Sequence, residues 1–174
     1  MTSSGSASRS GLAVTEMPFG LPGRVLRSPM PFSDFDPTGD SWRAYREFEV
    51  DTVVILAERE EALLRTGMDL FEFYRGQGLQ VVHVPIRDHA SPADAAALSA
   101  AVERALAAAG AGSNLAVHCY AGIGRTGVFL ALLARRALGL AGEEAISWVR
   151  RWIPGALETP GQQQFVIHWE APSP

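Results

Sequence analysis

The sequence predicts an α/β fold in a single domain, with a central, mostly parallel and twisted sheet of about four to five strands flanked by helices. Three observations support this class. The chain has 174 residues, of which 47% are apolar, which is enough for one hydrophobic core. Short β-branched runs alternate with longer segments of helical periodicity, the pattern of βαβ units. No apolar run reaches the length of about 18 residues that a membrane span needs, so none is expected.

The expected strands are compact apolar runs bounded by loop residues. Because they are apolar on both faces, they resemble the strands of a parallel sheet that helices cover on both sides. They occupy residues 24–27, 51–57 (DTVVILA), 79–86 (LQVVHVPI) and 115–119 (LAVHC). Ligands bind beyond the carboxyl ends of parallel strands, so the loops after residues 86 and 118 are the first candidates for a site.

The expected helices fill the intervals between these strands and most of the C-terminal part. They occupy residues 41–48 (with Asp40 as the cap), 58–67, 69–78, 91–109, 125–138, 143–153 and 159–168. Two of the helix starts combine a hydroxyl N-cap, a proline and an acid or amide: Ser91-Pro92-Ala93-Asp94 and Thr159-Pro160-Gly161-Gln162. The segment 125–138 is apolar nearly all round, which predicts a buried helix.

The remaining composition limits partners and location. Residues 1–19 are rich in Ser, Gly and Thr and lack the hydrophobic core of a signal peptide, so they are expected to form a disordered tail ahead of a domain at 20–174. A formal net charge of −4 with scattered arginines predicts neither nucleic-acid binding nor membrane insertion. The single cysteine excludes an intramolecular disulfide and favours the reducing cytoplasm. No feature predicts an oligomeric state.

The stretch HCYAGIGRTG at residues 118–127 places a thiol, glycines and an arginine between an expected strand and an expected buried helix. Gly122 and Gly124 let a ligand approach the backbone, and such a turn can aim successive N–H groups at an anion. The helix N-terminus and the planar guanidinium of Arg125 add positive charge. A tetrahedral oxyanion such as phosphate, sulfate or vanadate suits these groups. The expected phosphate-binding residues are Tyr120, Ala121, Gly122, Ile123, Gly124 and Arg125.

Cys119 lies at the base of this loop. A lone buried cysteine is more often an inert apolar residue, but here His118 precedes it, Arg125 follows six residues later and Thr126 comes next. A thiol near a helix N-terminus and an arginine is expected to ionise to the thiolate, which can attack phosphorus in line. Thr126 could then hydrogen-bond to the sulfur as it leaves, and His118 could orient the loop from below.

HCYAGIGRTG resembles the cysteine–x5–arginine phosphate loop of the protein tyrosine phosphatase superfamily, and within it the small dual-specificity-like and cyclin-dependent-kinase-inhibitor-3-like phosphatases. The resemblance covers most of the chain from about residue 24 onward. It implies a general acid some thirty residues before the cysteine. Asp88, 31 residues upstream in VPIRDHASP, fits that place, although alone it would read as a loop-capping aspartate. The same carboxylate can then deprotonate the water that hydrolyses the phosphocysteine.

The resemblance also points to TPGQQQF as a glutamine-bearing segment that can position water. Gln162 is the first candidate and Gln163 the second. The alternative interpretation is that Gln162 only completes a capping box with Thr159.

The sequence therefore predicts a phosphomonoesterase that works through a phosphocysteine and needs no metal or cofactor. Four scattered histidines and one cysteine have no metal-ligand spacing. Phosphotyrosine in proteins or peptides is the expected substrate, with phosphoserine and phosphothreonine left open. Inositol phosphates or phosphoinositides are the alternative, although the loop lacks the lysines that often meet extra phosphates. A third interpretation is a catalytically silent phosphopeptide-binding module. This interpretation is weakened by the presence of Cys119, Arg125 and Asp88 together.

Overall fold

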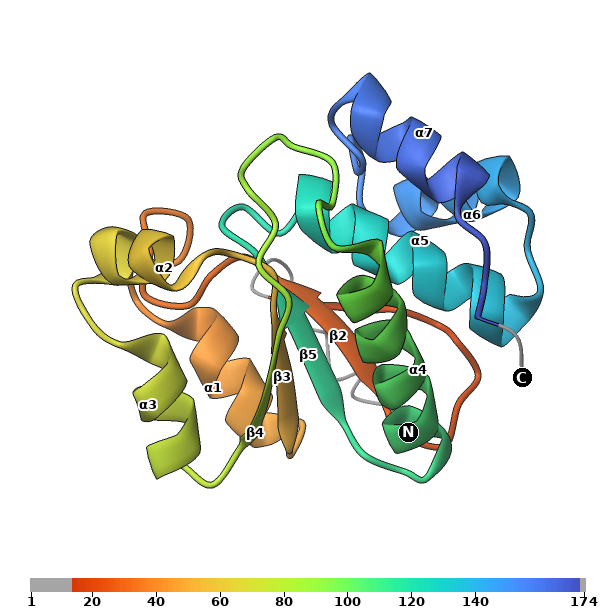
Figure 1. Ribbon diagram of the computed structural model, residues 1–174. Helices are drawn as coiled ribbons and strands as arrows, with labels where there is room; N and C mark the ends of the chain where they lie inside the picture. The colour runs from red at the N-terminus through yellow and green to blue at the C-terminus, as the bar shows by residue number, and fades with distance from the viewer. Residues whose placement is uncertain (1–13, 173–174) are drawn as a thin grey trace, which may run out of the picture.

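A five-stranded sheet lies at the centre of the computed structural model, which describes residues 14–172 (Figure 1). The strands are β1 (Thr15–Glu16), β2 (Val25–Ser28), β3 (Thr52–Ile55), β4 (Gln80–His83) and β5 (Leu115–His118). Their order is β1-β2-β5-β3-β4. β1 pairs antiparallel with β2 at one edge, and the other four strands run parallel. The predicted α/β class with a mostly parallel sheet is confirmed.

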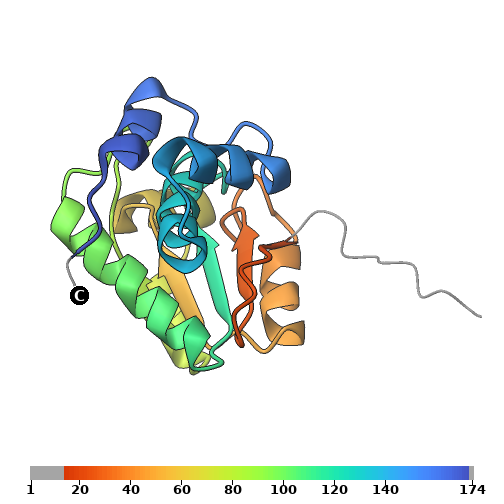
Figure 2. The same ribbon diagram turned by 90° about the vertical axis from the view of Figure 1, so that its right-hand side faces the viewer.

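Helices cover both faces of the sheet. They are α1 (Asp40–Glu47), α2 (Arg59–Thr66), α3 (Leu70–Gly76), α4 (Ala95–Gly110), α5 (Gly124–Leu138), α6 (Gly142–Trp152) and α7 (Pro160–His168). The helices α1 to α3 lie on one side of the sheet, and α4 to α7 lie on the other (Figure 1 and Figure 2). The domain therefore has three layers, with the sheet in the middle.

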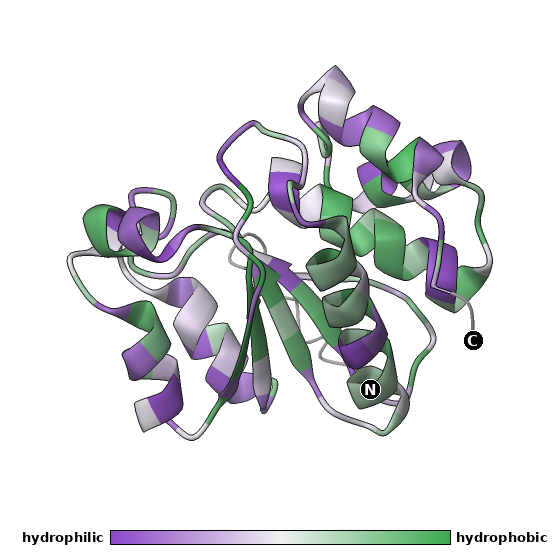
Figure 3. Cartoon of the chain, viewed as in Figure 1, coloured by the Kyte–Doolittle hydropathy of each residue, from purple (hydrophilic) through white to green (hydrophobic). Residues whose placement is uncertain are grey.

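The sheet separates two hydrophobic cores. Val54 of β3 packs in the core that α4 to α7 cover, whereas its neighbours Val53 and Ile55 pack in the core under α1 to α3. This alternation follows from the period of two in a strand. Figure 3 shows the central strands as mostly hydrophobic, as the burial of both their faces requires.

The predicted tail is too long at its C-terminal end. Thr15–Glu16 forms β1 against β2, and the side chains of Met17 and Phe19 are buried. The ring of Phe19 lies 5.0 Å from the ring of Trp148 in α6. The folded domain therefore includes Met17 and Phe19, whose apolar side chains are buried although the segment around them is polar. The rest of the predicted tail, residues 1–13, lies outside the described residues.

Two predicted helix caps are wrong. Ser91 does not cap α4; the helix begins at Ala95, and the carboxylate of Asp94 accepts from the backbone N–H of Ala97 at 2.8 Å. Asp40 is the first residue of α1, and the carboxylate of Asp36 caps it by accepting from the N–H groups of Asp40 and Ser41 at 2.8 and 2.9 Å. In both places another aspartate, in a better position, satisfies the free amides of the first turn.

Two further predictions concern the end of a strand and a helix cap. The strand predicted over residues 79–86 ends at His83 in β4, although the N–H groups of Val84 and Ile86 still donate to the carbonyls of Ile55 and Leu56, at 3.1 and 2.8 Å. The capping box at Thr159 is confirmed: Thr159 Oγ1 accepts from the backbone N–H of Gln162 at 3.2 Å at the start of α7.

The connections β3–α2, β4–α4 and β5–α5 all leave the sheet at the same edge, because β3, β4 and β5 are parallel. Figure 1 shows the β4–α4 loop and the start of α5 next to each other above this edge. The two loops that the sequence singles out thus lie together at the carboxyl ends of the strands.

Candidate active site

A cavity of about 300 Å³ opens at this edge of the sheet. The residues lining it come from six separate segments: Phe35, Arg65, Asp88, His89, Cys119, Tyr120, Ala121, Arg125 and Glu158. Cys119 is only 2% exposed and lies at the floor. The structure thus brings together Cys119, Arg125 and Asp88, the three residues that the predicted chemistry needs most.

In the loop from Cys119 to Arg125, the backbone carbonyls and the backbone amides differ in whether they form hydrogen bonds. The carbonyl oxygens of residues 120–123 all accept hydrogen bonds, in order from Met30 N, Arg27 Nη2, Arg27 Nε and Gly127 N. The N–H groups of residues 120–123 donate to no acceptor in the described part of the chain. A set of unused amide donors beside a thiol forms a nest for an anion.

Arg27 fixes the curvature of this loop from β2. Its Nε donates to the carbonyl of Gly122 at 2.6 Å and its Nη2 to the carbonyl of Ala121 at 2.9 Å. Gly122 has a φ of +75°, and a Cβ at this position would collide with the backbone carbonyl of Ser28. Burial lowers the pKa of Arg27, and the opposing effect of Cys119 raises it only in part. Nothing near Arg27 in the sequence predicts this contact, because the loop that it binds lies about 95 residues further along the chain.

Arg125 has most of its donors engaged and two within reach of a ligand. Nη1 donates to Glu61 Oε2 at 2.7 Å and to the carbonyl of Ile86 at 2.9 Å. Nη2 donates to Glu61 Oε1 at 2.9 Å and pairs with Asp88 Oδ1 at 3.1 Å. Nε has no partner among the residues that the structure describes. An oxyanion in the cavity could therefore take Nε, and also the Nη2 donor if Asp88 moves away.

Glu61 is a functional candidate that the sequence analysis missed. It lies in the first turn of α2 and holds the guanidinium of Arg125 with two hydrogen bonds. Burial disfavours the charge of Arg125, but the hydrogen bonds to Glu61 and the charges of Cys119, Glu61 and Asp88 raise its pKa above the usual value. The feature that could have identified Glu61 is the position of its helix in the topology. α2 begins just after β3, at the same edge of the sheet as the phosphate loop.

Asp88 is held at the cavity by few contacts. Its side chain is 41% exposed and touches Arg125 through one oxygen. The other oxygen is 3.6 Å from Nε2 of His89, and the backbone N–H of His89 donates to Oδ1 at 3.1 Å. A half-exposed carboxylate with these contacts can turn from Arg125 toward a substrate by rotating its side chain.

His118, predicted to orient the loop, lies under it and hydrogen-bonds to its first carbonyl. Its Nδ1 donates to the carbonyl of Cys119 at 3.0 Å, so Nε2 is free to accept from the hydroxyl of Tyr74, also at 3.0 Å. The ring is fully buried. Burial lowers the pKa of His118 to about 4, and the nearby charge of Arg125 acts in the same direction. The imidazole is therefore neutral at physiological pH.

Thr126 and the two glutamines have distinct surroundings. Thr126 Oγ1 is buried and has no hydrogen-bond partner in the described structure, so it does not bond to Cys119 here. Gln162 is fully buried: its Oε1 accepts from Thr159 N and its Nε2 donates to the carbonyl of Ala90, both at 3.4 Å. Gln163 instead bonds to the carbonyl of Leu157 at 3.2 Å. Of the two glutamines, only Gln162 lies beside the phosphate loop, close to Gly124.

Aromatic and charged side chains form the rim of the cavity. The ring of Tyr120 meets the edge of Phe35 at 4.7 Å between centroids, and the guanidinium of Arg65 lies 4.2 Å above Tyr120. Phe35 is 55% exposed. The segment between β2 and α1 thus contributes one wall of the cavity.

Comparisons with known proteins agree with this geometry. A family described as "Polymorphic toxin system, DSP-PTPase phosphatase" matches residues 31–137. Over 53 residues the chain is 43% identical to the human "Dual specificity protein phosphatase CDC14C", a match that covers 30% of this chain and only 12% of the human protein.

Solved structures share the fold over most of the chain. Tk-PTP in its active form is 30% identical, with a TM-score of 0.67 over 82% of this chain and 88% of that chain. Kinase associated phosphatase, with its catalytic-site cysteine substituted by serine, has a TM-score of 0.79 at 18% identity, over 91% and 94% of the two chains.

Fold and relatives together define a domain of the protein tyrosine phosphatase class. The chain belongs to the DSP-PTPase family, a dual-specificity-like branch of the cysteine-dependent protein tyrosine phosphatase superfamily. Within residues 14–172, no helix is long and apolar enough to cross a membrane. In the same residues no three His, Cys, Asp or Glu side chains gather where they could hold a metal ion.

Proposed function

We propose that the protein hydrolyses phosphomonoesters through a covalent phosphocysteine on Cys119. One observation carries this proposal. Cys119 shares a cavity with Tyr120 and Ala121, whose amides donate to no acceptor in the described chain, and with Arg125, whose Nε has no partner there. Unused donors of this kind can bind the oxygens of a phosphate held above the thiol.

In the first step, the phosphate binds to the loop amides and to Arg125, and it takes the Nη2 donor that now contacts Asp88. Asp88 is then free to face the leaving oxygen. Once it has left Arg125, Asp88 takes up a proton from solvent. The thiolate of Cys119 then attacks phosphorus, the bond from phosphorus to the leaving oxygen breaks, and Asp88 transfers its proton to that oxygen. The contact between Asp88 and Arg125 keeps the acid close to the site until a phosphate displaces it.

Two buried groups support the nucleophile. Thr126 Oγ1, next to the phosphate loop, has no partner among residues 14–172, so it is available to stabilise the sulfur as it leaves in the second step. His118 donates to the carbonyl of Cys119, which fixes the backbone from which the thiol projects.

Phosphotyrosine in a protein or peptide is the substrate that this rim supports best. Phe35 and Tyr120 present aromatic surface at the mouth, where the ring of a phosphotyrosine would pass. The carboxylates of Asp88 and Glu158 line the same cavity, and the loop has no lysine. Further phosphates on an inositol ring would meet these negative charges, so a polyphosphorylated substrate is disfavoured.

The test is hydrolysis of an aryl phosphate with a metal chelator present. We expect wild-type protein to turn over and Cys119→Ser to lose at least about 10⁴-fold in kcat while it still binds inorganic phosphate. Full activity of Cys119→Ser would overturn the mechanism, and loss of wild-type activity with chelator would overturn its independence of metal. A panel of phosphotyrosyl, phosphoseryl and phosphoinositide substrates then ranks the substrate classes.

A further inference from the structure

Among the described residues, two arginines line the cavity at Cys119, and they differ in their partners. Arg125 is held by the carboxylates of Glu61 and Asp88. Arg65, which is exposed in the last turn of α2, makes no hydrogen bond or ion pair with any residue that the structure describes. The mouth of the cavity therefore presents a cation that the proposed chemistry does not use and whose N–H donors can bind an anion.

The aromatic ring of Tyr120 holds Arg65 at this position. The Cζ atom of Arg65 lies over the ring, 4.2 Å from its centroid. Phe35 contacts the same ring, and the Tyr120 hydroxyl donates to Oδ2 of Asp34 at 3.4 Å, so the ring is itself held from two sides. A cation–π contact occupies none of the N–H groups of a guanidinium with an oxygen acceptor, so these donors stay available to an oxyanion. Because the ring already restricts the side chain, less entropy is lost when a ligand binds.

The two sides of the mouth carry opposite charges. Arg65 lies on the side of α2, whereas Glu158, which also lines the cavity, lies on the side of α7. Figure 1 shows α2 and α7 on opposite sides of the β4–α4 loop. Asp34 adds a negative charge at the hydroxyl end of the Tyr120 ring, but it forms no ion pair with Arg65. A carboxylate at the mouth is therefore attracted near Arg65 and repelled near Glu158.

The inference rests on the function proposed above, with phosphotyrosine in a peptide as the substrate. We propose that Arg65 binds a carboxylate side chain close to the phosphotyrosine and so selects peptides that are acidic on one flank. With the phosphate above Cys119, the tyrosine ring fills the cavity and the peptide backbone crosses its mouth. A residue one or two positions away lies about 3.5 or about 7 Å further along, at the level of the rim. A carboxylate there can accept two hydrogen bonds from one guanidinium.

A purely structural role for Arg65 has different consequences. If Arg65 served only the protein itself, its charge would favour the carboxyl end of α2 and its side chain would support Tyr120. Its loss would then lower stability, or lower activity to the same extent with every substrate. Recognition of a flanking carboxylate instead makes the effect of Arg65 depend on the charge of the peptide and on ionic strength. Selectivity between peptides separates the two roles.

The experiment uses phosphotyrosyl peptides of equal length that differ only in the residues flanking the phosphotyrosine. These residues are glutamate, lysine or glutamine, placed either before or after it. Values of kcat/KM are measured at low and high ionic strength for wild type, Arg65→Gln and Arg65→Glu. The control is Arg104→Gln, which removes an arginine at an exposed site in α4 and so changes the net charge by the same amount.

We expect glutamate on one flank to raise the kcat/KM of wild type about fivefold over glutamine, and this preference to shrink at high ionic strength. Glutamate on the other flank should bring no gain. Arg65→Gln should lose the preference, and Arg65→Glu should prefer lysine on the same flank. Arg104→Gln should keep the preference of wild type.

Three results would overturn the inference: no preference for glutamate in wild type, equal gains on the two flanks, or a preference that survives in Arg65→Gln. Activity of Arg65→Gln that falls equally with all peptides would also overturn it, because Arg65 would then support the fold alone. Wild-type protein that hydrolyses neither these peptides nor an aryl phosphate would refute the proposed function itself. The two failures are therefore distinct.

Discussion

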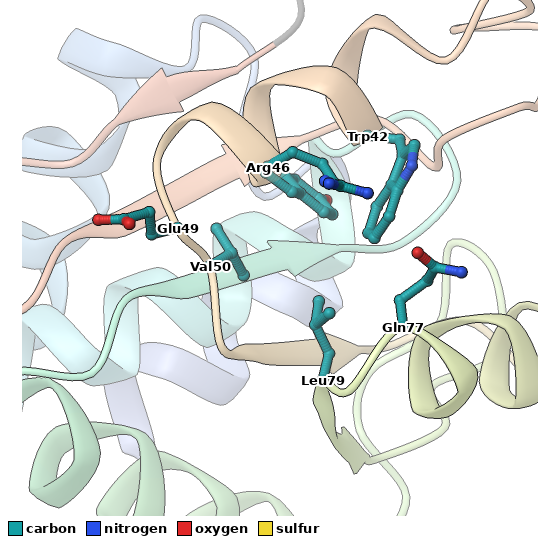
Figure 4. Close-up of a pocket in the computed structure, with 7 residues that line it drawn as sticks. Trp42, Arg46, Glu49, Val50, Gln77 and Leu79 are labelled. Carbon is teal, nitrogen blue, oxygen red and sulfur yellow. The ribbon is translucent and has the colours of Figure 1, made fainter.

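The cavity at Cys119 and a second cavity beside α1 and α3 have nearly the same volume, about 300 and about 270 Å³. The second is lined by Trp42, Tyr45, Arg46, Glu49, Val50, Gln77 and Leu79. Figure 4 shows Trp42 and Arg46 of α1 on one side and Gln77 and Leu79 on the other. Both cavities thus combine an arginine, a carboxylate and aromatic rings.

The two cavities differ in the end of the sheet at which they lie. Val50 and Leu79 come just before β3 and β4, so the second cavity is at the amino ends of the strands. There it meets the last turns of α1 and α3, the ends at which the helix dipole places partial negative charge. The cavity at Cys119 meets the first turn of α5 and a loop of unused amides. Volume does not distinguish the two cavities, whereas the backbone groups at their ends of the sheet do, together with the thiol and the second arginine that only the cavity at Cys119 contains.

Among substitutions in the two cavities, removal of the general acid Asp88 should have the largest effect on activity. We expect Asp88→Asn to lower kcat by about 10³-fold for a substrate with a poor leaving group, because the leaving oxygen then departs without a proton. The loss should shrink for aryl phosphates whose phenols are more acidic. Steady-state kinetics over a series of leaving groups measure this, and a loss that is equal across the series would show that Asp88 does not protonate the leaving oxygen.

The buried histidine under the loop should make stability depend on pH. The pKa of His118 is lowered to about 4 in the folded protein, below its unfolded value of 6.5. Between these values the unfolded chain binds the proton and the folded chain does not, so the free energy of unfolding falls as pH drops from about 6.5 to about 4. The full contribution is on the order of 3 kcal/mol.

Urea unfolding of wild type and His118→Asn at pH 7 and pH 4.5 measures this contribution. The variant should be less stable at pH 7 and should lose less stability than wild type on acidification. Parallel losses in the two proteins would contradict the assignment to His118.

Weakening the support of Arg125 should have a smaller effect. Glu61→Gln keeps the shape of the side chain but removes its charge, so one of two charge-assisted hydrogen bonds to Arg125 is lost. We expect kcat/KM to fall roughly tenfold, with weaker inhibition by inorganic phosphate. Unchanged inhibition by phosphate would mean that Glu61 does not position the guanidinium for the ligand.

The second cavity provides the smallest expected effect. Arg46→Gln removes its arginine, which is exposed and belongs to the last turn of α1. We expect kcat/KM for an aryl phosphate to stay within twofold of wild type, because none of the described residues that line this cavity also lines the cavity at Cys119. A substantial loss would show that the two cavities are coupled, and Tyr45, which lines the second cavity and bonds to Ser28 at 2.5 Å, would be the first contact to examine.

The sequence predicted the parts of the site that are local in the chain. The phosphate loop lies within ten residues, and the alternation of strands and helices placed it and the loop of Asp88 at one edge of the sheet. Arg27, Glu61 and Glu158 were missed because each reaches the loop only through the fold: from β2, from α2 and from the segment before α7. The local pattern at Ser91 predicts a cap, but Asp94 is the residue whose side chain reaches a free amide of α4.

The contact of Arg27 with the phosphate loop has a consequence for how the site responds to its ligand. Because the carbonyls of Ala121 and Gly122 are bound from β2, the loop acquires its shape when the sheet forms. Phosphate then meets a receptor that is already ordered, and the entropy of ordering is lost during folding, not on binding. Ligand affinity should therefore persist in urea as long as the sheet remains folded, and disappear together with it in one transition.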